Sequence, residues 1–226
     1  MTYLHYISFA VSPLLIIIIG FYLKFKFSIQ SFANIRNAVI WGMIGVVLLI
    51  LSNYIIDLRW EDNLRNMRRM SFFVFVGVAF SSEFAKFLIL RFAFYKLSSF
   101  EGPLEGIVYS IFISLGFSTV ASVLYAYGIV GTEFKFNDIT LYLFTYPFAS
   151  IVFGILMGFF IGMGKLRKNW LIDNSTGLFA VTFFHALFYF SFITADKRLL
   201  IFTTIGFLII AFTLIFKAVN LRAEKR

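Results

Sequence analysis

The sequence of 226 residues contains no cysteine, only two histidines and few charged residues. Without cysteine, the chain can form neither disulfides nor thiolate metal sites. Because His5 and His185 are the only imidazoles and no H-E-x-x-H motif occurs, the residues predict no metal site. Glycine loops of the Walker or Rossmann type are also missing, so no nucleotide and no other cofactor is expected.

The composition is that of a membrane protein. Charged residues make up 14% of the chain and hydrophobic residues 61%, against about 25% and 45–50% in soluble domains. Met1-Thr2-Tyr3 lacks the basic region of a signal peptide, and no A-x-A cleavage site follows, so the first apolar stretch is expected to stay as a helix. These features predict an all-α, polytopic helical bundle with the lipid bilayer as its surroundings.

Seven stretches are long enough to span a membrane, which takes about 20 apolar residues. They cover residues 5–23, 38–56, 71–94, 105–128, 140–163, 176–194 and 199–217. Only the third stretch is interrupted by charges. No linker rich in proline, glycine or serine divides the chain, so residues 1–226 are expected to form a single integral membrane domain.

The net charge of +9 does not indicate nucleic-acid binding, because Lys and Arg gather in short loops between the apolar stretches. One side of the membrane would hold Lys24, Lys26, Arg36, Lys96, Lys165, Arg167, Lys168, Lys217, Arg222, Lys225 and Arg226. The other side would hold Arg59, Arg65, Arg68, Arg69, Lys135, Lys197 and Arg198. The excess on the first side predicts a cytoplasmic C-terminus and an external N-terminus.

Glu83 and Lys86 lie inside the third stretch, where each charge costs about 2.5–3.5 kcal/mol by insertion scales. They are three residues apart and share a helix face, so they are expected to pair. His185 lies at a similar depth in the sixth stretch, so it could meet Glu83 in the bundle interior. A structural ion pair and a packing histidine are the alternatives to a catalytic site.

Two rows of small residues are interpreted as packing surfaces. Ser114, Ser118 and Ser122 repeat every four residues in the fourth stretch. Gly154, Gly158 and Gly162 form a double G-x-x-x-G pattern in the fifth. Such rows let neighbouring helices approach closely.

Several segments, in order along the chain, carry a family resemblance. They are Ser12-Pro13 with Phe21-Tyr22-Leu23-Lys24, Ser82-Glu83-Phe84-Ala85-Lys86, Glu105-Gly106-Ile107-Val108-Tyr109, Ser114-Leu115-Gly116-Phe117, Met157-Gly158-Phe159-Phe160-Ile161-Gly162 and Phe184-His185-Ala186-Leu187-Phe188-Tyr189. The first resembles the first span of the PrsW intramembrane proteases. The others are similar to that family's E-E-x-x-K, D-G-I-V-Y, S-L-G-F-A-T, M-G-F/Y-x-x-G and H-x-x-x-D segments.

The resemblance implies a bacterial cytoplasmic-membrane protease that cuts membrane-anchored regulatory proteins, with Glu83, Lys86 and His185 as its catalytic residues. Four family positions are replaced. Ser82 stands for the first glutamate, Ala121 for a later glutamate, Ser150 for a histidine and Tyr189 for the last aspartate. Each change removes a group that could move protons or bind a metal.

Three functions remain open from the sequence. In a reduced protease, Glu83 would act as base and His185 as acid or oxyanion donor, with Ser82 holding water and a hydroxyl of Tyr109 or Tyr125 donating a hydrogen bond. An inactive pseudoprotease would bind transmembrane clients without cutting them. A small transporter would use Glu83 and Lys86 along a polar path.

Overall fold

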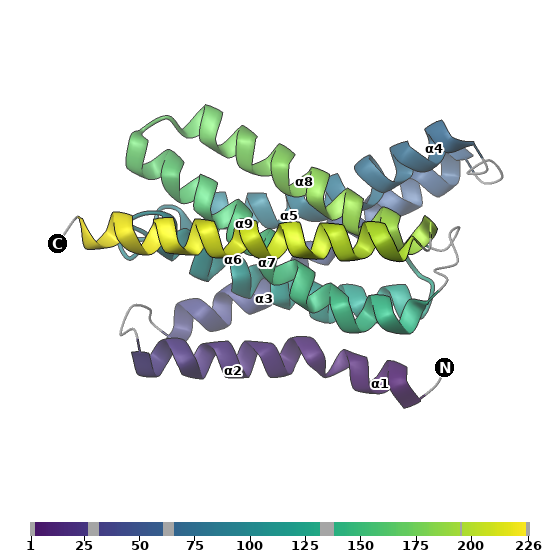
Figure 1. Cartoon of the computed structure of the whole chain (residues 1–226), viewed down its shortest axis with the longest axis horizontal. Helices are drawn as coiled ribbons and strands as arrows, with labels where there is room; N and C mark the ends of the chain where they lie inside the picture. The colour runs from purple at the N-terminus through teal and green to yellow at the C-terminus, as the bar shows by residue number, and fades with distance from the viewer. Residues whose placement is uncertain (1–2, 27–31, 61–65, 132–137, 195, 225–226) are drawn as a thin grey trace.

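The computed structural model describes residues 3–26, 32–60, 66–131, 138–194 and 196–224, and within these ranges it is a helical bundle without strands (Figure 1). The helices are α1 (Tyr3–Phe9), α2 (Val11–Lys26), α3 (Phe32–Trp60), α4 (Met67–Phe72), η1 (Phe73–Phe80), α5 (Ser81–Ile89), η2 (Leu90–Phe94), α6 (Pro103–Ala126), α7 (Ile139–Arg167), α8 (Trp170–Thr194) and α9 (Lys197–Ala223). The predicted all-α architecture is confirmed.

Seven of the described helical segments are long and apolar enough to cross a membrane, as the sequence predicts. They are Tyr3–Phe25, Phe32–Arg59, Met67–Phe94, Pro103–Ala126, Ile139–Arg167, Trp170–Thr194 and Lys197–Ala223. The sixth begins at Trp170, six residues earlier than expected. The expected start was too late because Asp173 and Asn174 lower the hydropathy of the first turns. Asp173 lies in the first turn of α8, where the helix dipole favours a carboxylate. The chain is an integral membrane protein.

The connections alternate between the two ends of the bundle, and the N- and C-termini lie at opposite ends (Figure 1). The last residues of α2, η2 and α7 lie at the end of the bundle where α9 also ends, and the basic residues Lys24, Lys96 and Lys165 are at or near these helix ends. Four positions used in the charge count, Arg65, Lys135, Lys225 and Arg226, lie outside the described residues.

Glycine residues set the distance between α6 and α7. A Cβ atom at Gly158 would lie 2.2 Å from the carbonyl oxygen of Gly106. The same atom at Gly162 would lie 2.4 Å from Cα of Pro103, and at Gly154 it would be 3.0 Å from backbone atoms of Ile111. The two backbones therefore touch along three turns, which confirms the packing interpretation of the G-x-x-x-G pattern.

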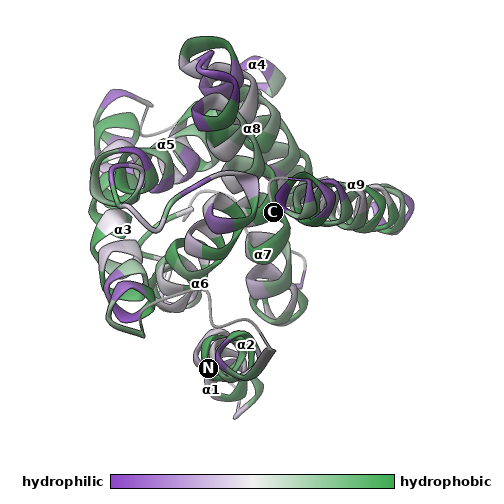
Figure 2. Ribbon diagram, turned by 90° about the vertical axis from the view of Figure 1, so that its left-hand side faces the viewer, coloured by the Kyte–Doolittle hydropathy of each residue, from purple (hydrophilic) through white to green (hydrophobic). Residues whose placement is uncertain are grey.

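The other sides of α6 are packed just as closely, so this helix occupies the middle of the bundle (Figure 2). Toward α3, a Cβ atom at Gly116 would lie 2.2 Å from the carbonyl oxygen of Val39. Toward α2, the hydroxyls of Ser118 and Ser12 form a hydrogen bond of 2.9 Å. The serine row is thus a packing surface, as predicted.

The third span is not a uniform α-helix. The α-helical segment α5 is only nine residues long, and the π-helical segments η1 and η2 precede and follow it. Such π-helical turns are rare and frequently occur at functional sites. The buried Asn53 of α3 holds this span in place, because its amide donates to the carbonyl oxygen of Gly77 and accepts from the N–H of Gly131.

Candidate active site

Glu83, Lys86 and His185 meet in the interior of the bundle and are called the charged centre below. The ammonium of Lys86 lies 2.5 Å from Oε1 of Glu83, and Nδ1 of His185 lies 2.7 Å from the same oxygen. All three side chains are at most 1% exposed. The expected pairing of Glu83 with Lys86 is observed, and so is the contact with His185 that the sequence allowed, whereas their catalytic roles stay a prediction.

Aromatic rings from α6 and α7 enclose the charged centre. The ring of Phe153 stacks on the imidazole of His185 with 4.9 Å between ring centres. The Lys86 ammonium lies 5.2 Å from the ring centre of Phe117 and 5.9 Å from that of Phe153. Because these rings lie beside the charges, the carboxylate depends on its two nitrogen partners for stabilisation.

The four positions that differ from the family pattern lie close along their helices to residues of the charged centre or of the rings that enclose it. Ser82 directly precedes Glu83, and Tyr189 follows His185 by one helical turn. Ala121 and Ser150 are one turn from Phe117 and Phe153, so they share helix faces with the rings that enclose Lys86. All four side chains are fully buried. The polar groups that the family resemblance leads us to expect would therefore converge here.

Tyr189 belongs to a cluster of four buried tyrosines that the sequence analysis missed. Its ring centre lies 5.9 Å from that of Tyr125 and 5.8 Å from that of Tyr142, and Tyr146 packs against both of these. Tyr146 in turn lies 5.9 Å from the His185 ring. The four-residue spacing of Tyr142 and Tyr146 was the available signal. Tyr189 thus packs in an aromatic cluster beside the charged centre.

Tyr109 lies in a different place from the one that the sequence analysis suggested. Its hydroxyl accepts a hydrogen bond from the side-chain amide of Asn34 at 3.3 Å and pairs with the hydroxyl of Ser99 at 2.8 Å. Its ring packs against Phe94 and Phe100. The suggestion that Tyr109 serves Glu83 is therefore wrong, because the hydroxyl is engaged near the loop after η2.

Comparison with known proteins identifies the family to which this helical membrane protein belongs. Residues 31–218 match the family described as PrsW family intramembrane metalloprotease. The chain belongs to the PrsW family. It is 28% identical over 188 residues to Protease PrsW of Oceanobacillus iheyensis, which covers 81% of each chain. It is also 28% identical over 171 residues to Protease PrsW of Bacillus subtilis, which covers 73% of each chain. No solved structure matches.

These PrsW homologues support a protease function for the scaffold, and their family description implies a metal ion. Catalytic zinc is held by three protein ligands in its common sites. The charged centre offers two such donors, Glu83 and His185, and no group of three His, Cys, Asp or Glu side chains occurs among the described residues. Lys86 also places its ammonium directly on the Glu83 carboxylate. The residues present therefore do not fit the family's metal.

Proposed function

We propose that this PrsW-family protein binds membrane-spanning segments of membrane-anchored proteins and has lost the hydrolytic chemistry of the family. The observation that carries the proposal is the pairing within the charged centre, where Lys86 and His185 both contact one oxygen of Glu83. The neighbouring positions Ser82 and Ser150 supply only hydroxyls. The arrangement is that of a structural ion pair inside an aromatic shell.

Peptide hydrolysis needs a group that activates water and groups that stabilise the oxyanion and protonate the leaving amine. In this structure Glu83 is 1% exposed and His185 is not exposed at all, so neither side chain is in contact with bulk water. A buried carboxylate with two cationic or donor partners is well satisfied without a substrate. This supports a structural role for the three residues.

A mainly apolar groove on the outer surface of the third span is suited to an apolar helix of a client. It lies between α3 and the η1–α5 segment and encloses about 520 Å³. Leu51, Ile55 and Val76 line it and are partly exposed on the outer surface of the bundle. Phe84, the neighbour of Glu83, lines it as well. We call it the α3–α5 groove and propose it as the place where a client segment packs.

A second candidate is a protease with Glu83 as its single catalytic glutamate, and the contact of 2.7 Å between Glu83 and His185 favours it. Glu83 would take a proton from water, and His185 would deliver a proton to the leaving amine. Nε2 of His185 is buried and has no hydrogen-bond partner among the described residues, so this nitrogen could face a substrate. Lys86 would hold Glu83 in position.

We further propose a bacterial cytoplasmic membrane as the location, with the C-terminal end of the bundle inside the cell. The named relatives come from bacteria, and the C-terminal end carries the larger share of Lys and Arg in short loops. A cysteine introduced at Lys217 in this cysteine-free chain would react with a membrane-impermeant maleimide only after cell lysis. Labelling in intact cells would contradict this orientation.

The decisive experiment compares four proteins in liposomes that contain a panel of single-span reporter proteins. These are the wild type, Glu83→Gln, a variant with Ser82→Glu, Ala121→Glu, Ser150→His and Tyr189→Asp, and Protease PrsW of Bacillus subtilis. We expect the relative to cut at least one reporter and the wild type to cut none. Photo-crosslinking should show that the wild type and Glu83→Gln bind the same reporter equally well.

The outcomes separate the two candidates. Cleavage by the wild type that disappears in Glu83→Gln would overturn the binding proposal and establish the protease with one glutamate. Val76→Trp, which would fill the α3–α5 groove, should abolish crosslinking if clients bind there. Unchanged crosslinking in this variant would mean that the client binds to another face of the bundle. Cleavage by the fourfold variant alone would show that a peptide bond of the reporter still reaches the charged centre in this fold.

A further inference from the structure

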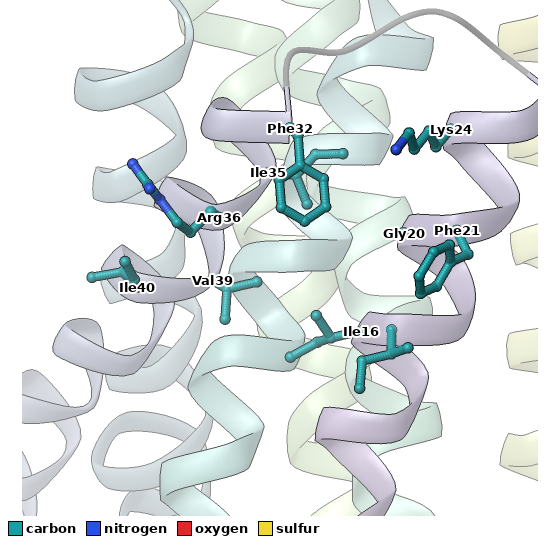
Figure 3. Close-up of a pocket in the computed structure, with 10 residues that line it drawn as sticks. Ile16, Gly20, Phe21, Lys24, Phe32, Ile35, Arg36, Val39 and Ile40 are labelled. Carbon is teal, nitrogen blue, oxygen red and sulfur yellow. The ribbon is translucent and has the colours of Figure 1, made fainter.

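A second groove lies between α2 and α3 (Figure 3). It encloses about 390 Å³, and its walls are almost entirely apolar. Ile16 and Gly20 line it from α2, and Ile35 and Val39 line it from α3. Both helices pack on α6 (Figure 2), and the lining residues Ile17, Phe21 and Ile40 are exposed on the surface of the bundle.

One end of this α2–α3 groove is basic. Lys24 extends from α2 toward α3, and Arg36 stands on the far wall with its guanidinium directed away from α2 (Figure 3). Both side chains are exposed, and neither forms an ion pair with a carboxylate among the described residues. The contact found for the Arg36 guanidinium is a long hydrogen bond of 3.4 Å to the side chain of Asn37.

We infer that the α2–α3 groove binds an anionic phospholipid. Its phosphate would lie between Lys24 and Arg36, and one acyl chain would run along the apolar walls toward Ile16. Basic pockets between membrane-spanning helices recognise anionic headgroups in this way. Long basic side chains reach the headgroup level while their stems cover apolar surface, so Arg36 turns toward the phosphate without any change in the backbone.

Charge and shape together favour this occupant over a client helix. An apolar helix has no need of two unpaired cations at one end of its binding site, whereas a lipid combines one anionic group with an apolar chain. Gly20 adds room for that chain, because a Cβ atom at this position would meet no other atom within 4 Å. The inference is independent of whether the charged centre cuts peptides.

The test is native mass spectrometry of the detergent-purified full chain with phosphatidylglycerol or with phosphatidylcholine of the same acyl chains. Lys24→Gln with Arg36→Gln removes the charges, and Gly20→Trp fills the groove while keeping them. The matched controls are Lys96→Gln with Lys217→Gln, which removes two exposed charges at the same end, and Gly206→Trp on α9. Gly206 also has open space around its Cβ position.

We expect the wild type to bind phosphatidylglycerol at least about tenfold more tightly than phosphatidylcholine. The double glutamine variant should bind phosphatidylglycerol about thirtyfold more weakly, with the larger part of the loss due to Lys24. Gly20→Trp should weaken the binding of both lipids, and the two controls should bind as the wild type does.

Equal binding of the two lipids by the wild type would overturn the inference, and so would unchanged binding in Lys24→Gln with Arg36→Gln. An equal loss of phosphatidylglycerol binding in Lys96→Gln with Lys217→Gln would mean that general surface charge causes the effect, and this result would overturn the inference too.

Discussion

The charged centre and the glycine contact between α6 and α7 are both buried in the same bundle, yet they depend on opposite properties. The contact at Gly158 and Gly162 works because side-chain atoms are missing, since any Cβ would collide with the facing backbone. The charged centre works through groups that are present and paired. The glycine segment resembles the family pattern, whereas Ser82, Ala121, Ser150 and Tyr189 differ from the groups that the resemblance leads us to expect near the centre.

The largest loss of stability is expected from a variant that breaks the charged centre. Glu83→Ala leaves the Lys86 ammonium buried between Phe117 and Phe153 without its carboxylate. Removal of one partner of a buried ion pair costs about 3–5 kcal/mol. We expect this loss in the free energy of unfolding, measured by denaturant titration in mixed micelles.

The matched control replaces both charges by groups of similar size. Glu83→Gln with Lys86→Met removes the pair without leaving an uncompensated charge, so most of the stability should return. If the double variant recovered its stability and still bound clients, the centre would be structural. A double variant as unstable as Glu83→Ala would mean that the bundle requires these charges themselves.

The next effect concerns the contact between α6 and α7. Gly158→Ala places a Cβ atom 2.2 Å from the carbonyl oxygen of Gly106, so the backbones must separate. Overpacking of this kind costs typically 1–3 kcal/mol, and we expect a value of about 3. The same titration measures it, and Gly206→Ala is the control because its Cβ position is open. Equal stability of the two variants would contradict the close approach of the helices.

Much of this architecture could be predicted from the sequence, because the bilayer imposes simple rules. The seven spans follow from apolar length, and equal depth in the membrane allowed the contact of Glu83 with His185 that the structure shows. The tyrosine cluster and the role of Asn53 could not be predicted, since both depend on which helix faces meet. The two π-helical segments next to α5 leave no mark in hydropathy.

The smallest effect tests whether the serine contact behaves like the glycine contact or like the charged centre. Ser12 and Ser118 join α2 to α6 by one hydrogen bond of 2.9 Å. A double-mutant cycle with Ser12→Ala and Ser118→Ala should give a coupling of about 0.6 kcal/mol, the average for such bonds in membrane proteins. Because alanine fills nearly the same space, the helices keep their distance and each single variant loses little. A coupling above about 1.7 kcal/mol would exceed the largest values measured for such bonds. The two serine hydroxyls would then behave like the charged centre, because in both places a buried polar group that has lost its partner lowers the stability.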